Sequence, residues 1–120
     1  MKQDSPPAAA PPAPEPTRDP ARLGEALCAA LLTPGSREEM ARFLTDLCTP
    51  AEIRTLGERW HVARLLDGTG LSYREIHDAT GVSTTTIVRV ARFLRQEPNR
   101  GYRQALDASA SKTGGGGDAG

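Results

Sequence analysis

The sequence predicts an all-α fold, and three observations support this prediction. Apolar residues between Leu23 and Leu106 recur every three or four positions, the period of a helix with one buried face. Serine or threonine precedes four of these apolar stripes at a position suited to a helix N-cap. The chain has no run of alternating β-branched residues that would indicate strands.

The foldable part of the chain is expected to be residues 21–106. Seven of the first 20 residues are proline, and residues 107–120 are small and polar with a glycine run at 114–117. Such segments bury too little apolar surface to fold, so disordered tails are predicted at residues 1–20 and 107–120. A domain of this size has a thin core of its own, which favours a compact helical domain or an oligomer.

Composition excludes several classes of protein. No apolar run approaches the roughly 18 residues of a membrane-spanning helix, and the N-terminus lacks the apolar segment of a secretory signal. Two cysteines and two histidines are too few for a disulfide framework or a zinc site. Cys28 and Cys48 could pair with each other, but we expect two reduced core thiols in a cytoplasmic protein. No metal, no cofactor and no membrane partner are expected.

The first two helices are predicted from their stripes and their ends. The first runs from Pro20 to Leu32, before the breaker Thr33-Pro34-Gly35. Ser36 is expected to cap the second, with Glu39 completing a capping box. The two stripes are Leu23, Ala26, Leu27, Ala30 and Leu31 in the first helix, and Met40, Phe43, Leu44 and Leu47 in the second.

The third helix has the strongest start signal in the chain. Thr49 stands at the cap, Pro50 at the first helical position and Glu52 at the third. The helix is expected to end at Asp67-Gly68 and to carry on one face Ile53, Leu56, Gly57, Trp60, Ala63 and Leu66. Because residues 23–66 offer more apolar surface than one short chain can cover, a homodimer is predicted.

A helix-turn-helix motif is predicted over about residues 72–96. Ser72 and Glu75 form a capping box for a short helix over residues 73–80, and Ser83 caps the next helix. Gly81 supplies the positive φ that a tight turn between them requires. The spacing of Ile76, Val82 and Ile87, with the inward stripe of Val90, Ala91 and Leu94, completes the pattern. Pro98 is expected to end the second helix, and a last short helix is expected over Gly101 to Ala108.

This motif favours double-stranded DNA as the partner. The net charge is zero, with 15 basic and 15 acidic residues, but residues 84–103 carry five arginines against Glu97 alone. A local positive excess suits an anionic partner. The second helix of such a motif enters the major groove, and its predicted outward face is Thr84, Thr85, Val88, Arg89, Arg92 and Arg95. Phosphate contacts are expected at two helix starts and one first turn, at Ser72, Ser83 and Arg74.

The same threonines and arginines also fit roles that involve no DNA. The threonines could be a solvated helix start, and the arginines a solvated helix face. An enzyme is disfavoured, because no histidine and carboxylate are spaced to activate a nucleophile, and the glycine run follows no strand. The alternatives to a transcription regulator are a helical protein-interaction module and an accessory DNA-binding factor.

The sequence resembles the Trp repressor family, and within it the YerC/YecD-type branch. The resemblance covers about residues 23–106 and rests on several motifs in order: residues 43–52 (FLTDLCTPAE), 56–60 (LGERW), 63–66 (ARLL), 71–76 (LSYREI) and 80–84 (TGVST). It implies an all-helical, intertwined homodimer, and a bacterial, cytoplasmic (nucleoid-associated) transcription regulator, here predicted to be a repressor. Its target would be a near-palindromic DNA site.

The resemblance also implies roles for individual residues. Arg74, His77, Thr84, Thr85 and Thr86 fall where the family contacts DNA, with Arg89 close to phosphate. His77 stands where the repressor has lysine, and a neutral histidine is a weaker phosphate partner.

Thr49, Arg59 and Arg89 fall where the repressor holds its tryptophan corepressor, with the indole ring between the two arginines. The floor of that slot is glycine in the repressor and Val90 here, on the face predicted to point inward. We therefore expect a vestigial pocket, DNA binding without tryptophan, and no small-molecule effector. The arginines would then pair with phosphate or with a carboxylate such as Glu52 or Glu58.

Overall fold

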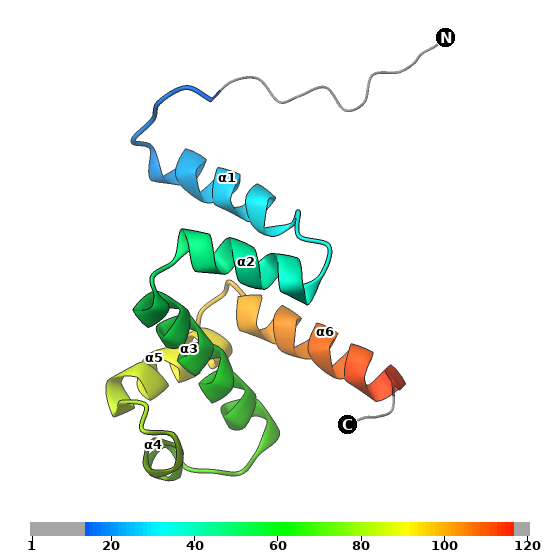
Figure 1. Ribbon diagram of the computed structural model, residues 1–120. Helices are drawn as coiled ribbons and strands as arrows, with labels where there is room; N and C mark the ends of the chain where they lie inside the picture. The colour runs from blue at the N-terminus through cyan, green and yellow to red at the C-terminus, as the bar shows by residue number, and fades with distance from the viewer. Residues whose placement is uncertain (1–13, 117–120) are drawn as a thin grey trace. The chain divides into compact units, whose positions relative to one another are not determined.

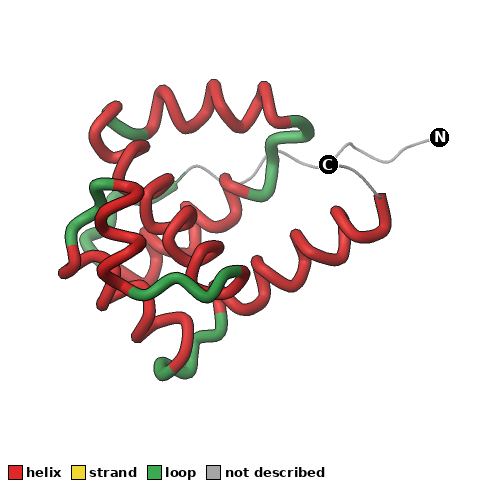
Figure 2. Tube along the Cα trace, turned by 90° about the horizontal axis from the view of Figure 1, so that it is seen from below, coloured by secondary structure: helices red, strands yellow, loops and turns green. Residues whose placement is uncertain are grey.

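The computed structural model describes residues 14–116, and these residues form helices and loops without a strand (Figures 1 and 2). The predicted all-α fold is confirmed. The chain divides into two compact units, one up to Phe43 and one from Leu44 onward. Residues 1–13 and 117–120, and with them most of the predicted N-terminal tail, lie outside the described part.

The first unit contains helix α1 (Pro20–Leu31) and the start of α2 (Arg37–Leu47). Asp19 caps α1 by accepting a hydrogen bond from the backbone N–H of Ala21 at 3.1 Å. The Ser36 hydroxyl accepts from the N–H of Glu39 at 3.1 Å, as a capping residue should. The Glu39 carboxylate, however, accepts from Gly35 at 2.7 Å, one residue earlier than the predicted capping box requires.

Helices α1 and α2 bury no residue within this chain. The apolar stripe of α1 is open to solvent, with Leu23 54% exposed. The prediction of two core thiols is therefore wrong for this chain, since Cys28 is exposed and Cys48 is half-buried. The physical reason is that neither cysteine lies on a predicted apolar stripe and that α1 and α2 bury no residue within the chain. Apolar stripes of this kind indicate a surface that packs against something else.

Helix α3 (Pro50–Gly68) opens with the predicted capping box in full. The Thr49 hydroxyl accepts from Glu52 at 3.1 Å, and the Glu52 carboxylate accepts from Thr49 at 2.8 Å. Only the second half of the helix is buried, at Val62, Ala63 and Leu66. The predicted face is thus corrected: Val62 belongs to the core, whereas Leu56 is 50% exposed and Gly57 has open space beside it.

Helices α4 (Tyr73–Thr80) and α5 (Thr84–Arg95) form the predicted helix-turn-helix. Between them Gly81 has φ 76°, the left-handed conformation that favours glycine. Ile76 and Ile87, one from each helix, are fully buried. Val82, in the turn between the two helices, is part of the same core. The remaining core residues are Val90 and Ala91 of α5 and the buried face of α3.

Helix α6 (Gly101–Gly116) follows Arg100, whose φ is 60°, and packs against α3 and α5. It continues past Ala108, where the sequence predicted its end, into the segment predicted to be a disordered tail. Two contacts hold the part of the helix that precedes Ala108. Leu106 is buried, and Arg103 pairs with Asp107 one turn later at 2.9 Å.

Arg103 also ties α6 to the end of α3. Its guanidinium donates two hydrogen bonds to the carboxylate of Asp67, both at 2.9 Å. Nearby, Arg95 of α5 donates to the backbone carbonyl of Leu66 at 3.2 Å. Two of the five arginines between residues 84 and 103 therefore hold helices together, and the positive excess available to an anionic partner is smaller than the sequence predicted.

The Asp67–Arg103 pair should make stability depend on pH. The hydrogen bonds from Arg103 hold the pKa of Asp67 below its ordinary value of 3.8. A lowered pKa means that the carboxylate stabilises the fold above pH 3.8 and that this contribution is lost as the pH falls below it. Asp67→Asn should therefore lower the thermal midpoint at neutral pH, and the difference from wild type should vanish in acid. Circular dichroism melts at both pH values measure this.

Asp78→Asn is the matched control, because Asp78 pairs with Arg74 at 3.5 Å on a surface where the two side chains are 62% and 82% exposed. An exposed pair of this kind contributes little. A midpoint difference for Asp67→Asn that persists unchanged in acid would contradict the prediction.

Candidate nucleic-acid interface

The N-terminal half of α5 presents an exposed face made of Thr84, Thr85 and Val88. Residues at i, i+1 and i+4 of a helix lie on neighbouring positions of one side. The opposite side of the same helix is anchored by Ile87, Val90 and Ala91, which are buried. The core therefore fixes which side chains of α5 point outward, and these include two of the threonines predicted to contact DNA.

The third threonine has a different position. The Ser83 hydroxyl donates to the Thr86 hydroxyl oxygen at 3.0 Å and accepts from the Thr86 backbone N–H at 3.1 Å. Thr86 is half-buried. Its hydroxyl belongs to the N-cap of α5, so the structure places Thr86 with the helix start instead of with the exposed face.

The two predicted phosphate sites at helix starts are unequal. At α4 the Glu75 carboxylate accepts from the backbone N–H of Ser72 at 2.8 Å, so a negative charge already occupies this helix start. At α5 the first turn contains no acidic residue. Because the N-terminal end of a helix favours an anion and a carboxylate disfavours a second one, the start of α5 at Ser83 is the better phosphate position.

His77 lies at the end of α4 and ties the turn together. Its Nδ1 is 2.8 Å from the carbonyl oxygen of Val82, and its own carbonyl accepts from Gly81 at 2.8 Å. Because a carbonyl oxygen only accepts, Nδ1 carries the proton in this bond, and Nε2 of the neutral ring is then an acceptor. His77 therefore positions the turn, and it can donate to a phosphate through Nε2 only when the ring is protonated.

The arginines predicted to face DNA are held by their own neighbours. Arg74 pairs with Asp78 at 3.5 Å, and Arg92 pairs with Glu97 at 3.5 Å. The guanidinium of Arg92 also lies 5.0 Å from the ring centre of Phe93. Both ion pairs are exposed, and exposed pairs exchange readily for another anion.

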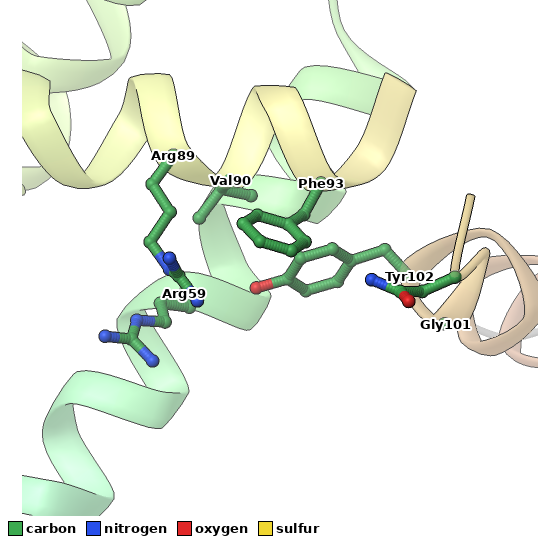
Figure 3. A pocket seen from close by; sticks show the side chains of 7 residues that line it. Arg59, Arg89, Val90, Phe93, Gly101 and Tyr102 are labelled. Atoms are coloured by element: carbon green, nitrogen blue, oxygen red, sulfur yellow. The ribbon is translucent and has the colours of Figure 1, made fainter. Parts of the chain in front are cut away.

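Arg89 contacts an aromatic side chain of its own helix. Its guanidinium lies 4.5 Å from the ring centre of Phe93, a cation–π distance. Figure 3 shows it extending from α5 toward Arg59 on α3. The two side chains line a pocket of about 320 Å³ together with Val90, Phe93, Asn99, Gly101 and Tyr102.

This pocket is positively charged, because two guanidinium groups and no carboxylate are among its lining residues. The Nε of Arg59 is buried and has no hydrogen-bond partner among the described residues. A buried donor without an acceptor is costly. The pocket therefore suits an anion. The carboxylate of Glu52, considered from the sequence as a partner for Arg59, is engaged instead in the capping box of α3.

The structure brings together three of the four residues predicted for a vestigial ligand pocket. Arg59, Arg89 and Val90 line it, and Val90 is only 1% exposed, so the inward position predicted from periodicity is confirmed. Thr49 is elsewhere: it caps α3 ten residues before Arg59, which corresponds to about 15 Å along a helix. Within one chain Thr49 cannot complete this pocket.

Sequence reasoning missed the residues that close the pocket. Phe93 had a usable signal, since an aromatic residue four positions after Arg89 on a helix lies over that arginine. Asn99 and Tyr102 could not be predicted from the sequence, because they reach the pocket only through the packing of α6 on α5. Among the described residues, no group of histidine, cysteine and carboxylate side chains could hold a metal, and no helix is long and apolar enough to cross a bilayer.

The fold and this face define a protein with a helix-turn-helix motif, the kind of motif whose second helix enters the major groove of DNA. The model of the family described as Trp repressor protein matches residues 24–110, which is more than half of the chain. The chain therefore belongs to the Trp repressor family, a family of regulators and not of enzymes.

Individual relatives agree with this assignment. YerC of Bacillus subtilis (strain 168), whose own function is uncharacterized, is 49% identical over 70 residues. That match covers 58% of this chain and 65% of YerC, so the chain spans just under two thirds of that relative. It confirms the YerC-type branch predicted from the motifs.

Two solved structures share the fold. A TrpR-like protein from Eubacterium eligens ATCC 27750 is 35% identical with a TM-score of 0.68, over 74% of this chain and 90% of that one. A candidate Trp repressor from Staphylococcus aureus is 41% identical with a TM-score of 0.67, over 76% of this chain and 88% of that one.

Proposed function

We propose that this protein is a sequence-specific, double-stranded DNA-binding transcription regulator. It acts as a homodimer and as a repressor in the cytoplasm, in association with the nucleoid, without tryptophan as corepressor. The observation that carries the proposal is the exposed face of Thr84, Thr85 and Val88 at the start of α5. The first turn of α5 has no acidic residue, and the buried residues on the opposite side of the helix keep this face exposed.

The open apolar stripes support the homodimer. Leu23 and Leu27 of α1, Leu47 of α2 and Leu56 of α3 are all exposed in the single chain. A second copy would cover such surface, and an open space beside Gly57 would admit a crossing helix. Two copies of α5 related by a two-fold axis read half-sites about 34 Å apart, so the target is a near-palindrome.

The dimer is tested by analytical ultracentrifugation of the full chain at micromolar concentration. We expect a single species of twice the chain mass, because exposed stripes of this size destabilise a lone chain in water. Leu23→Glu should shift the population toward monomer, whereas Gln104→Ala, at an exposed position of α6, should not. A monomer that unfolds cooperatively would contradict the dimer.

The DNA-binding face is tested with two variants. Thr85→Glu should abolish specific binding, because a carboxylate in the major groove is repelled by the phosphates and by the acceptor atoms of the bases. Arg92→Ala should weaken binding to all sequences and lower the slope of log affinity against log salt by about one unit. Fluorescence anisotropy with duplex DNA over a series of salt concentrations measures both effects.

Gln104→Ala is the control for both variants, and it should bind as wild type does. An unchanged salt slope for Arg92→Ala would show that this arginine stays with Phe93 and Glu97 instead of reaching a phosphate.

The pocket supports DNA binding without tryptophan. In the family an indole ring stacks between the arginines that correspond to Arg59 and Arg89. Here the side chain of Val90 occupies the floor, and the ring of Phe93 already covers the Arg89 guanidinium. The internal aromatic side chain thus supplies the contact that an indole would make, and the arginines that remain suit an anion such as a DNA phosphate.

Tryptophan binding is measured by isothermal titration calorimetry. We expect no binding at micromolar concentrations and a change in DNA affinity of less than tenfold on adding tryptophan, which is about 1.4 kcal/mol of coupling. Phe93→Ala is the informative variant, since it frees the face of Arg89. Stoichiometric micromolar binding to the wild-type chain would contradict the prediction.

A further inference from the structure

Val88 is the apolar residue of α5 that faces solvent. The other aliphatic side chains in the middle of this helix, Ile87, Val90 and Ala91, are buried, whereas Val88 is 53% exposed. Valine is a poor helix former, and an exposed valine adds nothing to the core. Neither helix formation nor packing within the chain therefore explains a valine at this position.

The surface around Val88 carries methyl groups and hydroxyls, and the nearest arginines of α5 contact other side chains of the chain. Thr84 and Thr85 lie on the same side of α5 and each has a γ-methyl group. Arg89 points toward the pocket and lies over Phe93 (Figure 3). Arg92 lies over the same ring and pairs with Glu97. A bidentate arginine contact to guanine, the commonest specific contact in the major groove, would require one of these guanidinium groups to leave its present partners.

The chemistry of the face matches one base edge. Among the four bases, thymine presents a methyl group in the major groove, and aliphatic side chains contact it. We propose that α5 reads the 5-methyl group of thymine, with Val88 as the specificity-determining residue and the methyl groups of Thr84 and Thr85 beside it. This inference rests on the proposed DNA-binding function and names the base that the function recognises.

The effect of one methyl contact is small but measurable. Removing a buried methyl group from an apolar contact should weaken binding about fourfold. A homodimer on a near-palindrome makes the contact twice, so removing both methyl groups should weaken binding about tenfold to twentyfold, because well-separated contacts add.

The experiment first obtains the site and then alters single methyl groups. The full chain selects duplexes from a random library, and each thymine of the selected site is replaced in turn by deoxyuridine, which lacks the methyl group but pairs identically. We expect a loss of about fourfold at one symmetric pair of positions, per substituted half-site. Deoxyuridine at the remaining positions and in the flanks serves as the DNA control.

Protein variants connect that position to Val88. Val88→Ala should lose affinity for the thymine site and should no longer distinguish thymine from deoxyuridine there, because the two changes remove the same contact. Val88→Thr, which keeps the shape of the side chain, should retain part of the discrimination. Thermal midpoints confirm that both variants fold, as expected for an exposed position, and Gln104→Ala should behave as wild type.

The possible results distinguish the thymine contact from the DNA-binding function on which it rests. Selection that returns no bound duplex would overturn the DNA-binding function and this inference together. Sequence-specific binding that is indifferent to deoxyuridine at every position, or that discriminates equally in Val88→Ala, would overturn the thymine contact alone and leave the DNA-binding function standing.

Discussion

The burial of Ile76 and Ile87 against α3 is the contact on which the candidate interface depends. Both side chains are fully buried, one from each helix of the motif, together with Val62 and Ala63. Gly81 permits this packing because its φ of 76° turns the chain sharply enough for the two short helices to meet over one core. Because one side of α5 is fixed in this way, the opposite side with Thr84, Thr85 and Val88 is exposed to solvent.

Arginine has two different roles in this chain. Arg95 and Arg103 bind a carbonyl and two carboxylates and thereby join α5 and α6 to the end of α3. Arg59 and Arg89 line a pocket without a carboxylate among its lining residues. Charge counted along the sequence cannot separate these roles, because both use the same side chain at similar spacing. The partner that each guanidinium reaches decides whether its charge is available to an anion.

The pocket and the proposed DNA-binding face share one helix. Val90 and Phe93 of α5 close the pocket from inside, and Val88 on the same helix faces solvent. Phe93 lies 4.5 Å from the Arg89 guanidinium, and the buried Val90 lines the same pocket beside it. Under the proposed function, the buried side of α5 holds this helix in its orientation without tryptophan.

The sequence by itself determined the helices and the turn, because these depend on local chemistry. Capping boxes at Thr49 and Ser72, the glycine at position 81 and the spacing of Ile76 and Ile87 act within a few residues of one another, and each was predictable. Only the tertiary structure decided that α6 continues beyond Ala108, that Cys28 is exposed, that Thr86 belongs to a cap and that Tyr102 reaches the pocket. These features depend on which distant surfaces meet, and a helical period shows that a face is apolar but not what covers it.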